Sequence, residues 1–385
     1  MRIDREITTA LQKMLSKYPV IALTGPRQSG KTTLLRAIFP DFQYVSLENP
    51  DNRDFAQSDP NGFLEKYSSK VIIDEIQRVP SIFSYIQSQV DESGLMGQYI
   101  LSGSQNFHLM HNITQSLAGR VAIFKLFPFD HQELKSASLL NDDYSANLVR
   151  GFYPAIYDRD IPSRIFYSNY IQTYIQRDIS ELISIKNTKL FQNFLSLCAT
   201  HAGQLLNMSA LANQCGISQP TAKSWISVLE SSYILFTLQP LHKNLSKRVV
   251  KTPKLYFYDT GLLCHLLKIK SPDQILTHPI KGHLFENMMI AEYVKRMHHK
   301  NALEDVWFWR DSAGHEIDFL VEDGLTMDLF EIKSTQTVMS GQFKGLNYFD
   351  QNYESEKIKK SLVYTGSEKQ KRTAIEIIPW ADFGM

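Results

Sequence analysis

The sequence predicts an α/β protein that begins with a doubly wound parallel sheet, continues with a helical region and ends with a second α/β domain. Short apolar runs alternate with helical patterns in the first 136 residues, which is typical of a parallel sheet with helices on both faces. The pattern is mostly helical from residue 163 to residue 200, and a second α/β pattern begins at residue 282. We therefore expect domains at residues 1–136, 137–207, 208–270 and 271–385.

The first domain is expected to open with a helix from Ile7 to Tyr18 and a buried strand from Val20 to Leu23. A second helix should run from Thr32 to Phe39, because Pro40 ends the helical pattern. Four more apolar runs predict strands at Gln43–Leu47, Val71–Asp74, Tyr99–Ser102 and Ala122–Phe127.

The later parts of the chain differ in periodicity. Residues 163–200 are mostly helical in pattern, and residues 208–267 contain two short helices followed by two strand-like runs. In the last domain a helix that carries Leu284 and Ala291 comes first. Strands are then expected at Val306–Arg310, Glu316–Val321, Asp328–Ser334 and Ser361–Tyr364.

Composition narrows the class of protein. The 385 residues carry a net charge of +1, which excludes a uniformly basic coat for nucleic acid. Charge is segregated, however: residues 241–300 hold 11 basic and 4 acidic residues, whereas residues 301–385 hold 9 basic and 15 acidic residues. A local basic surface therefore stays compatible with the sequence.

Three cysteines without C-x-x-C spacing argue against a disulfide framework and against a zinc finger. The first residues contain no apolar signal core, and the chain has no apolar run of about 18 residues. We expect a cytoplasmic protein with no membrane contact.

A glycine-rich loop of the pattern G-x-x-x-x-G-K-[ST] follows the first predicted strand, at Gly25-Pro26-Arg27-Gln28-Ser29-Gly30-Lys31-Thr32. The backbone N–H groups of such a loop point at phosphate, and the helix that follows adds its positive end. We expect these residues and Thr33 to bind ATP, with Lys31 on the β- and γ-phosphates and Thr32 on Mg²⁺.

The predicted strand Val71–Asp74 ends in an acidic residue, Asp74, and a second acidic residue, Glu75, follows it directly. Asp74 is expected to hold Mg²⁺, and Glu75 is expected to act as general base on the attacking water. The next strand ends in Ser102-Gly103-Ser104-Gln105, where Ser104, or alternatively Gln105, could orient that water. An ordinary loop start is the competing interpretation of these polar residues.

One arginine is a candidate for stabilising the transferred phosphoryl group. Arg120 precedes the fifth predicted strand and could act as an arginine finger, either within its own chain or from a neighbouring subunit. A solvated or ion-paired arginine is the structural alternative, and Arg177 is a weaker candidate for the same role.

Residues 209–229 predict a helix-turn-helix unit, with a glycine turn at Gly216 and a helix start near Ser218. The strand-like runs that follow would form a wing, and the loop between them is basic, with Lys243, Lys247, Arg248, Lys251 and Lys254. Such a wing suits a DNA backbone. A structural or protein-docking unit with a solvated loop is the alternative.

The last domain places two carboxylates and a lysine on neighbouring strands. Strand alternation puts Glu331 and Lys333 on one face, and pairing with the preceding strand would bring Asp318 beside them. Carboxylates of this kind bind Mg²⁺ or Mn²⁺, and Glu286 on the preceding helix could complete the set. A hairpin with one solvated face is the alternative.

Together these residues resemble a family of prokaryotic AAA+-type ATPases with a winged-helix segment and a PD-(D/E)XK nuclease-like domain. The resemblance runs end to end. It is carried by the phosphate loop, Ile73-Asp74-Glu75-Ile76-Gln77, Leu117-Ala118-Gly119-Arg120, residues 173–179, residues 254–263, Gly282-His283-Leu284-Phe285-Glu286-Asn287 and Glu331-Ile332-Lys333-Ser334.

The resemblance implies a P-loop ATPase core with an extra strand between the phosphate loop and the Walker B strand, and a restriction-endonuclease-like fold at the carboxyl terminus. It implies Glu75 as the catalytic base and Glu286, Asp318, Glu331 and Lys333 as the nuclease-like set. We expect an ATPase that acts on DNA. A nucleotide-gated regulator with a non-cleaving carboxyl-terminal module is the alternative, and a homo-oligomer or a protein partner stays open.

Overall fold

The computed structural model describes residues 3–104, 116–174, 187–241, 250–302, 305–324, 326–352 and 357–384. Contacts divide the chain into two compact units. Unit 1 comprises residues 1–129 with the short segments 231–233 and 298–302, and unit 2 comprises the rest.

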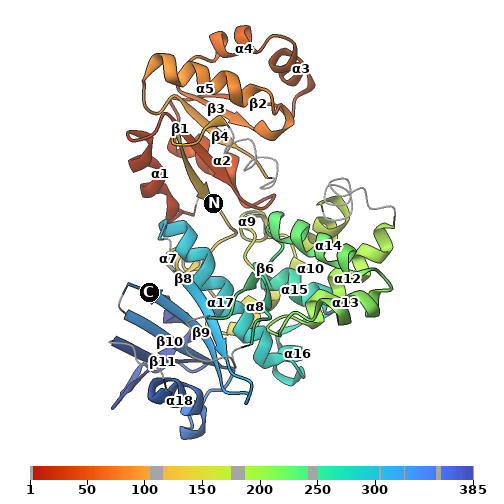
Figure 1. Cartoon of the computed structure of the whole chain (residues 1–385), viewed down its shortest axis with the longest axis vertical. Helices are drawn as coiled ribbons and strands as arrows, with labels where there is room; N and C mark the ends of the chain where they lie inside the picture. The colour runs from red at the N-terminus through yellow and green to blue at the C-terminus, as the bar shows by residue number, and fades with distance from the viewer. Residues whose placement is uncertain are drawn as a thin grey trace. The chain divides into compact units, whose positions relative to one another are not determined.

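Unit 1 contains a five-stranded parallel sheet of order β2-β3-β4-β1-β5 (Figure 1). All five strands predicted for this domain are present, at β1 Val20–Thr24, β2 Gln43–Ser46, β3 Val71–Asp74, β4 Tyr99–Ser102 and β5 Val121–Lys125. Because β4 lies between β1 and β3, one strand separates the phosphate loop from Asp74, as the resemblance implies.

Helices cover both faces of this sheet, because the side chains of each strand alternate between two cores. Val20 and Ala22 of β1 face one core, and Ile21 and Leu23 face the other. The helices are α1 Ile7–Leu15 and α2 Lys31–Ile38 on one side, and α3 Pro50–Ser58, α4 Pro60–Lys66 and α5 Ile82–Ser93 on the other (Figure 1).

Unit 2 begins with short helices and includes one β-hairpin. The helices are α7 His131–Ser136, α8 Tyr144–Arg150, α9 Pro154–Asp158, α10 Ser163–Tyr170, α12 Thr188–Thr200, α13 Met208–Cys215, α14 Gln219–Ser231, α15 Thr260–Leu266 and α16 Pro272–Thr277. The hairpin pairs β6 Leu235–Leu238 with β7 Lys254–Phe257.

A six-stranded mixed sheet of order β12-β13-β11-β10-β9-β8 completes unit 2. Its strands are β8 Asp305–Arg310, β9 Glu316–Asp323, β10 Thr326–Lys333, β11 Lys357–Tyr364, β12 Gln370–Arg372 and β13 Ile375–Pro379. The last two strands were not predicted. β12 consists of Gln-Lys-Arg at the sheet edge, where polar residues are tolerated, so it carries no apolar signal.

Two helices pack on this mixed sheet. Tyr293 of α17 Lys281–Lys300 contacts the rings of Phe319 and Phe330, which are paired across β9 and β10. Leu346 of α18 Lys344–Asn352 belongs to the core that includes Leu320 and Leu329. The sheet is therefore buried on both faces, and only its strand ends are left to form a site.

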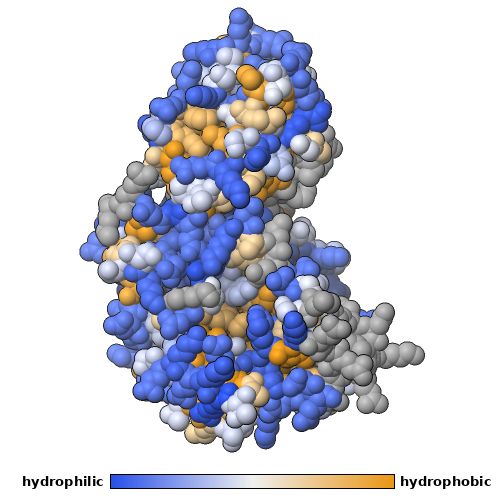
Figure 2. Space-filling view, turned by 90° about the vertical axis from the view of Figure 1, so that its left-hand side faces the viewer, coloured by the Kyte–Doolittle hydropathy of each residue, from blue (hydrophilic) through white to orange (hydrophobic). Residues whose placement is uncertain are grey.

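The face seen in Figure 2 is mostly hydrophilic, with apolar side chains in smaller groups. Among the described residues, the most exposed large apolar side chains are the adjacent Leu95 and Met96 and, elsewhere in the chain, Ile165, Leu276 and Met339. In the part of the chain that the structure describes, no helix combines the length and the apolar character needed to cross a bilayer.

The packing of α5 can be tested by substitution. Phe83 is fully buried in the core against the sheet, and Tyr85, two residues away, is 38% exposed. We expect Phe83→Ala to lower the free energy of unfolding by about 3–5 kcal/mol, because it leaves a cavity. Tyr85→Ala should change it by about 0.5 kcal/mol or less. Urea unfolding followed by circular dichroism measures both, and equal losses would contradict the assignment of the buried face.

Candidate functional site

The phosphate loop of unit 1 has a backbone that only glycine can adopt at its ends. Gly25 has φ +144°, and a Cβ there would lie 2.1 Å from the Leu126 carbonyl oxygen. Gly30 has φ +95° and caps the start of α2. The loop can therefore turn tightly between β1 and α2. The amino-terminal end of α2, which carries the positive end of the helix dipole, directly follows the loop.

Lys31 lies inside this loop. Its Nζ donates to the carbonyl oxygens of Gly25, at 2.9 Å, and Pro26, at 2.8 Å. Burial lowers the pKa of Lys31 to about 8, against the opposing effect of Glu75 and Asp74. A buried ammonium group whose hydrogen bonds, among the described residues, go to neutral carbonyls is suited to an anionic ligand, because phosphate oxygens would compensate its charge.

Asp74, at the end of β3, is hydrogen-bonded to the residue expected to share Mg²⁺ with it. Thr32 Oγ1 donates to Asp74 Oδ2 at 2.7 Å, and the hydroxyl of Tyr44 on β2 donates to the same oxygen at 2.9 Å. Adjacent hydroxyl and carboxylate oxygens are hard donors of the kind that Mg²⁺ prefers, so the residues fit this ion. Burial and the neighbouring Asp74 raise the pKa of Tyr44 to about 12.

Glu75 follows Asp74 in a left-handed conformation, with φ +54°. Its Oε2 accepts hydrogen bonds from Gln77 Nε2 at 2.5 Å and from Ser104 Oγ at 3.5 Å. Burial raises the pKa of Glu75 above its ordinary value. Ser104 thus contacts the carboxylate of Glu75 directly, whereas Gln105 lies outside the described residues.

Gln77 and Tyr44 were not predicted as site residues. Gln77 lies two residues after Glu75, within a motif that the resemblance already includes, so that motif held the signal for it. Tyr44 had no motif, and it reaches Asp74 because β2 and β3 are neighbours with Tyr44 paired to Ile72.

Arg120 does not lie at the phosphate loop of its own chain. It precedes β5 at the edge where the parallel strands begin, and Val121 pairs with Val20, whereas the loop follows Thr24 at the other edge. Four residues of strand separate the two edges by roughly 13 Å. Arg120 instead pairs with Asp91 through two hydrogen bonds of 2.5 and 2.8 Å. The expected role within the same chain is therefore wrong, and Arg177 lies outside the described residues.

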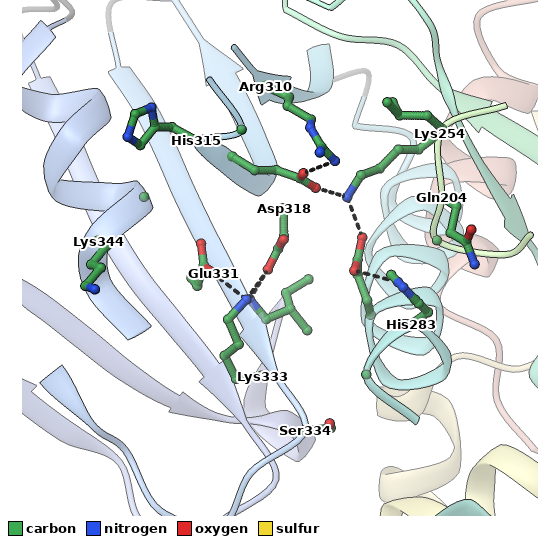
Figure 3. Close-up of a pocket in the computed structure, with 18 of the residues that line it drawn as sticks. Gln204, Lys254, His283, Arg310, His315, Asp318, Glu331, Lys333, Ser334 and Lys344 are labelled. Carbon is green, nitrogen blue, oxygen red and sulfur yellow. Dashed lines mark hydrogen bonds and ion pairs between the residues drawn. The ribbon is translucent and has the colours of Figure 1, made fainter. Parts of the chain in front are cut away.

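In unit 2 the antiparallel pairing of β9 and β10 brings Asp318, Glu331 and Lys333 together (Figure 3). Lys333 Nζ lies 3.2 Å from Asp318 Oδ2 and 2.5 Å from Glu331 Oε1. Asp318 Oδ2 also accepts from the backbone N–H of Ile332 at 2.8 Å. Period-2 alternation explains this arrangement, because Glu331 and Lys333 share one face of β10.

The charges of this group are strongly perturbed. Burial, reinforced by Asp318, raises the pKa of Glu331 to about 8, and burial also raises the pKa of Asp318. For Lys333 burial favours the neutral amine, but Asp318 and Glu331 outweigh it and raise its pKa. Glu331 Oε2 is buried and has no hydrogen-bond partner among the described residues. An orphaned carboxylate oxygen beside a second carboxylate fits a divalent cation.

Glu286 of α17 lies in the same cavity but has different partners. Lys254 Nζ is 2.9 Å from Glu286 Oε1, and the Tyr256 hydroxyl donates to that oxygen at 2.6 Å. Burial opposes ionisation of Glu286, but Lys254 and hydrogen bonds from His283, Lys254 and Tyr256 lower its pKa to about 2. Lys254 also pairs with Glu316, which Arg310 contacts at 2.9 Å.

These side chains line a cavity of about 860 Å³. It is bordered by the start of α17, the start of β9, the end of β10 and the start of α18, with Gly203, Gln204 and Lys254 on the side of the hairpin (Figure 3). The four residues expected in the nuclease-like set all line it: Glu286, Asp318, Glu331 and Lys333.

In the segment predicted as a helix-turn-helix unit, α13 and α14 follow one another across a short turn, and the β6–β7 hairpin comes after them. Gly216 ends α13 with φ +69°, and Ser218 Oγ accepts from the Thr221 backbone N–H near the start of α14. Residues 242–249 of the basic loop lie outside the described residues, and Lys251 is exposed. Lys254, which was assigned to that loop, is instead buried with 3% of its side chain exposed, so its place on a basic surface was wrong.

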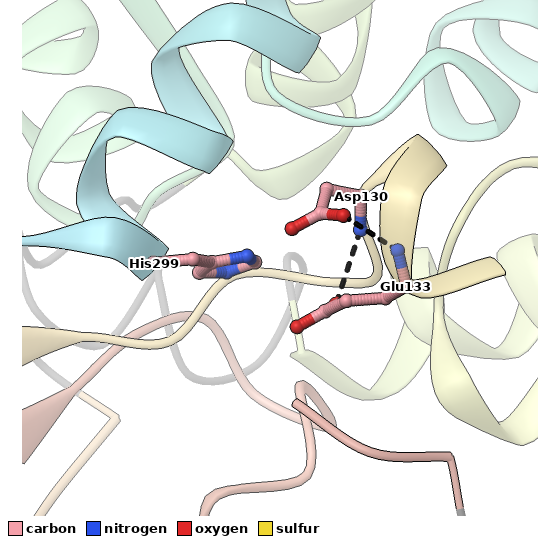
Figure 4. Close-up of side chains that lie close together, drawn as sticks. All are labelled: Asp130, Glu133 and His299. Carbon is pink, nitrogen blue, oxygen red and sulfur yellow. Dashed lines mark hydrogen bonds between the residues drawn. The ribbon is translucent and has the colours of Figure 1, made fainter. Parts of the chain in front are cut away.

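Two further buried acidic residues, Asp130 and Glu133, cap the start of α7. The Glu133 backbone N–H donates to Asp130 Oδ1 at 2.8 Å, and the Asp130 N–H donates to Glu133 Oε2 at 3.2 Å (Figure 4). This capping box satisfies two donors at the helix start. His131 is kept neutral, because burial lowers its pKa to about 3.

Three family models match successive segments of the chain. Residues 17–135 match the model of an AAA domain. Residues 141–273 and 281–383 match two domains of unknown function (DUF8612 and DUF4143). Uncharacterized proteins of Mycobacterium tuberculosis and Mycobacterium bovis are each 28% identical over 336 residues, which is 86% of this chain and 74% of theirs.

Among solved structures, a Walker-type ATPase of Pyrococcus abyssi has a TM-score of 0.46 at 15% identity, over 69% of this chain and 96% of the other. The RuvB Holliday junction branch migration motor of Thermotoga maritima has a TM-score of 0.29 at 17% identity, over 61% and 89%. The match to an AAA domain thus covers the parallel sheet and the loop between β1 and α2, which has the backbone of a phosphate-binding loop.

Proposed function

We propose that this protein binds ATP with Mg²⁺ at its phosphate loop and hydrolyses the bond between the β- and γ-phosphates. The observation that carries the proposal is the convergence of Lys31, Thr32, Asp74 and Glu75 at the edge where the parallel strands end. Ligands bind at this edge in open α/β sheets. The match of residues 17–135 to an AAA domain supports it.

Each residue has a distinct role in this proposal. Lys31 would exchange its carbonyl partners for phosphate oxygens, and Thr32 and Asp74 would hold Mg²⁺. The ion, when bound, supplies positive charge that offsets the charge of the phosphates. Glu75 would accept the proton of the attacking water, while Gln77 and Ser104 keep its carboxylate oriented through Oε2.

Lys31→Ala is expected to abolish measurable ATP binding, because it removes the buried positive charge of the loop. Lys13→Ala, on the exposed side of α1, is a matched control that removes a lysine away from the loop. Equilibrium binding of a fluorescent ATP analogue measures both. Binding by Lys31→Ala with the affinity of the wild type would exclude this loop as the nucleotide site.

Glu75→Gln is expected to bind ATP but to hydrolyse it about 10²–10⁴-fold more slowly, because the amide cannot accept a proton. The raised pKa of Glu75 also sets the pH dependence. The deprotonated form is active, so activity of the wild type should fall on acidification at a pH above the ordinary glutamate pKa. Steady-state hydrolysis across pH tests this, and normal turnover by Glu75→Gln would contradict the assignment.

A second activity is favoured by the cavity in unit 2. We infer that Asp318 and Glu331, with Glu286, hold Mg²⁺ or Mn²⁺ and that Lys333 assists metal-dependent cleavage of DNA. The unpartnered Oε2 of Glu331, among the described residues, supports a cation there. The ion, when bound, would polarise a phosphodiester oxygen. Lys333 would place its positive charge near the developing negative charge.

Cleavage of single- and double-stranded DNA with Mg²⁺ or Mn²⁺, with and without ATP, tests the second activity. We expect Lys333→Ala to lose cleavage while its ATP hydrolysis is intact. Lys359→Ala, an exposed lysine of β11, is the control and should cleave like the wild type. If the wild type leaves both DNA forms intact under every condition, the protein is a nucleotide-driven regulator whose last domain only binds.

A further inference from the structure

A lysine from outside the carboxyl-terminal sheet reaches its carboxylate cavity. Lys254 begins β7, in the segment that matches one domain of unknown function, whereas Glu286 and Glu316 belong to the segment that matches the other. The Lys254 ammonium contacts both carboxylates, and only 3% of its side chain is exposed. Figure 3 shows it directed into the cavity from the hairpin, while Lys333 enters from β10.

The contacts of Lys254 are of the kind that a divalent cation makes. Its Nζ joins oxygen atoms of two carboxylates from different elements, α17 and β9. Mg²⁺ and Mn²⁺ are bound by carboxylate oxygens in the same way. Glu286 Oε1 also accepts from the Tyr256 hydroxyl, so the hairpin supplies two donors to this single oxygen.

Two of the lysines that line the cavity divide its carboxylates between them. Lys333 pairs with Asp318 and Glu331, whereas Lys254 pairs with Glu286 and Glu316. A cation that binds Asp318 and Glu331 therefore meets Glu286 Oε1 only if Lys254 gives up that oxygen. The ring of Phe308, 5.5 Å from the Lys254 ammonium, helps to hold the lysine in place.

We propose that Lys254 is an internal counter-ion that competes with divalent cations for Glu286 and Glu316. The lysine that the hairpin supplies then lowers the metal affinity of the cavity. This inference rests on the metal-dependent activity proposed above. It identifies Lys254 as a positioning residue and not as a catalytic residue.

The test is Mn²⁺ binding to the full chain, measured by isothermal titration calorimetry. Lys254→Met keeps the length of the side chain and removes its charge. We expect it to bind Mn²⁺ at least about tenfold more tightly than the wild type, because Glu286 and Glu316 lose their competitor. Added Mn²⁺ should also raise the melting temperature of Lys254→Met more than that of the wild type.

Two variants separate this effect from a general change in charge. Lys254→Arg keeps the positive charge and should bind Mn²⁺ with nearly wild-type affinity. Lys344→Met removes an exposed lysine that lines the same cavity and has no ion pair among the described residues. It should change the affinity less than about threefold, since an exposed charge is well screened.

A measurement on the wild type keeps the inference testable if Lys254→Met does not fold. Acetylation of Lys254 by acetic anhydride, read by mass spectrometry, should increase when Mn²⁺ is added, because the released amine becomes accessible. Unchanged acetylation would overturn the inference, as would equal or weaker Mn²⁺ binding by folded Lys254→Met.

The outcomes also distinguish this inference from the proposed nuclease activity. Tighter Mn²⁺ binding by Lys254→Met without DNA cleavage by any variant supports the counter-ion and refutes the cleavage. If the wild type cleaves DNA, and if the wild type and Lys254→Met bind Mn²⁺ with equal affinity, the nuclease activity is supported and the counter-ion role of Lys254 is refuted.

Discussion

The direction of the parallel strands in unit 1 is the constraint on which its site depends. β1, β3 and β4 all end at the same edge of the sheet, so the residues that follow them meet there. The phosphate loop leaves β1, Asp74 and Glu75 leave β3, and Ser104 follows β4. The same constraint places Arg120 at the opposite edge, because it precedes a strand.

Buried charge organises the cavity of unit 2. Four carboxylates and two buried or half-buried lysines are paired within it, and an ion withdrawn from water must be compensated by a partner at close range. Strand alternation supplies the first pair of partners, Lys333 with Asp318 and Glu331. The second set, Lys254 with Glu286 and Glu316, is formed between segments that match different domain families. The cavity is thus a product of both segments.

Much of this could be predicted from sequence, where the signal is local. Apolar runs located the five strands of unit 1, the glycine pattern located the phosphate loop, and period-2 alternation placed Glu331 beside Lys333. The edge strand β12 was missed because its residues are polar. Lys254 was misassigned because a count of basic residues in a loop contains no information about partners that come from later elements.

Tyr44 is a second residue whose partner could not be predicted from local sequence. Its hydroxyl contacts Asp74 only because β2 and β3 are neighbours, a fact of sheet order that no spacing in the sequence contains. Arg120 was different, since the parallel direction of the predicted strands already implied the edge at which it lies. The position of Arg120 away from the phosphate loop could therefore have been predicted from the sequence.

The central claim is that the Lys31 ammonium, now on two loop carbonyls, is the group that receives the phosphates. A crystal structure with Mg²⁺ and a non-hydrolysable ATP analogue tests it most directly. We predict that Lys31 Nζ leaves the oxygens of Gly25 and Pro26 and lies about 2.7–3.2 Å from oxygens of the β- and γ-phosphates. A bound nucleotide with Lys31 Nζ still on both carbonyls would contradict the account.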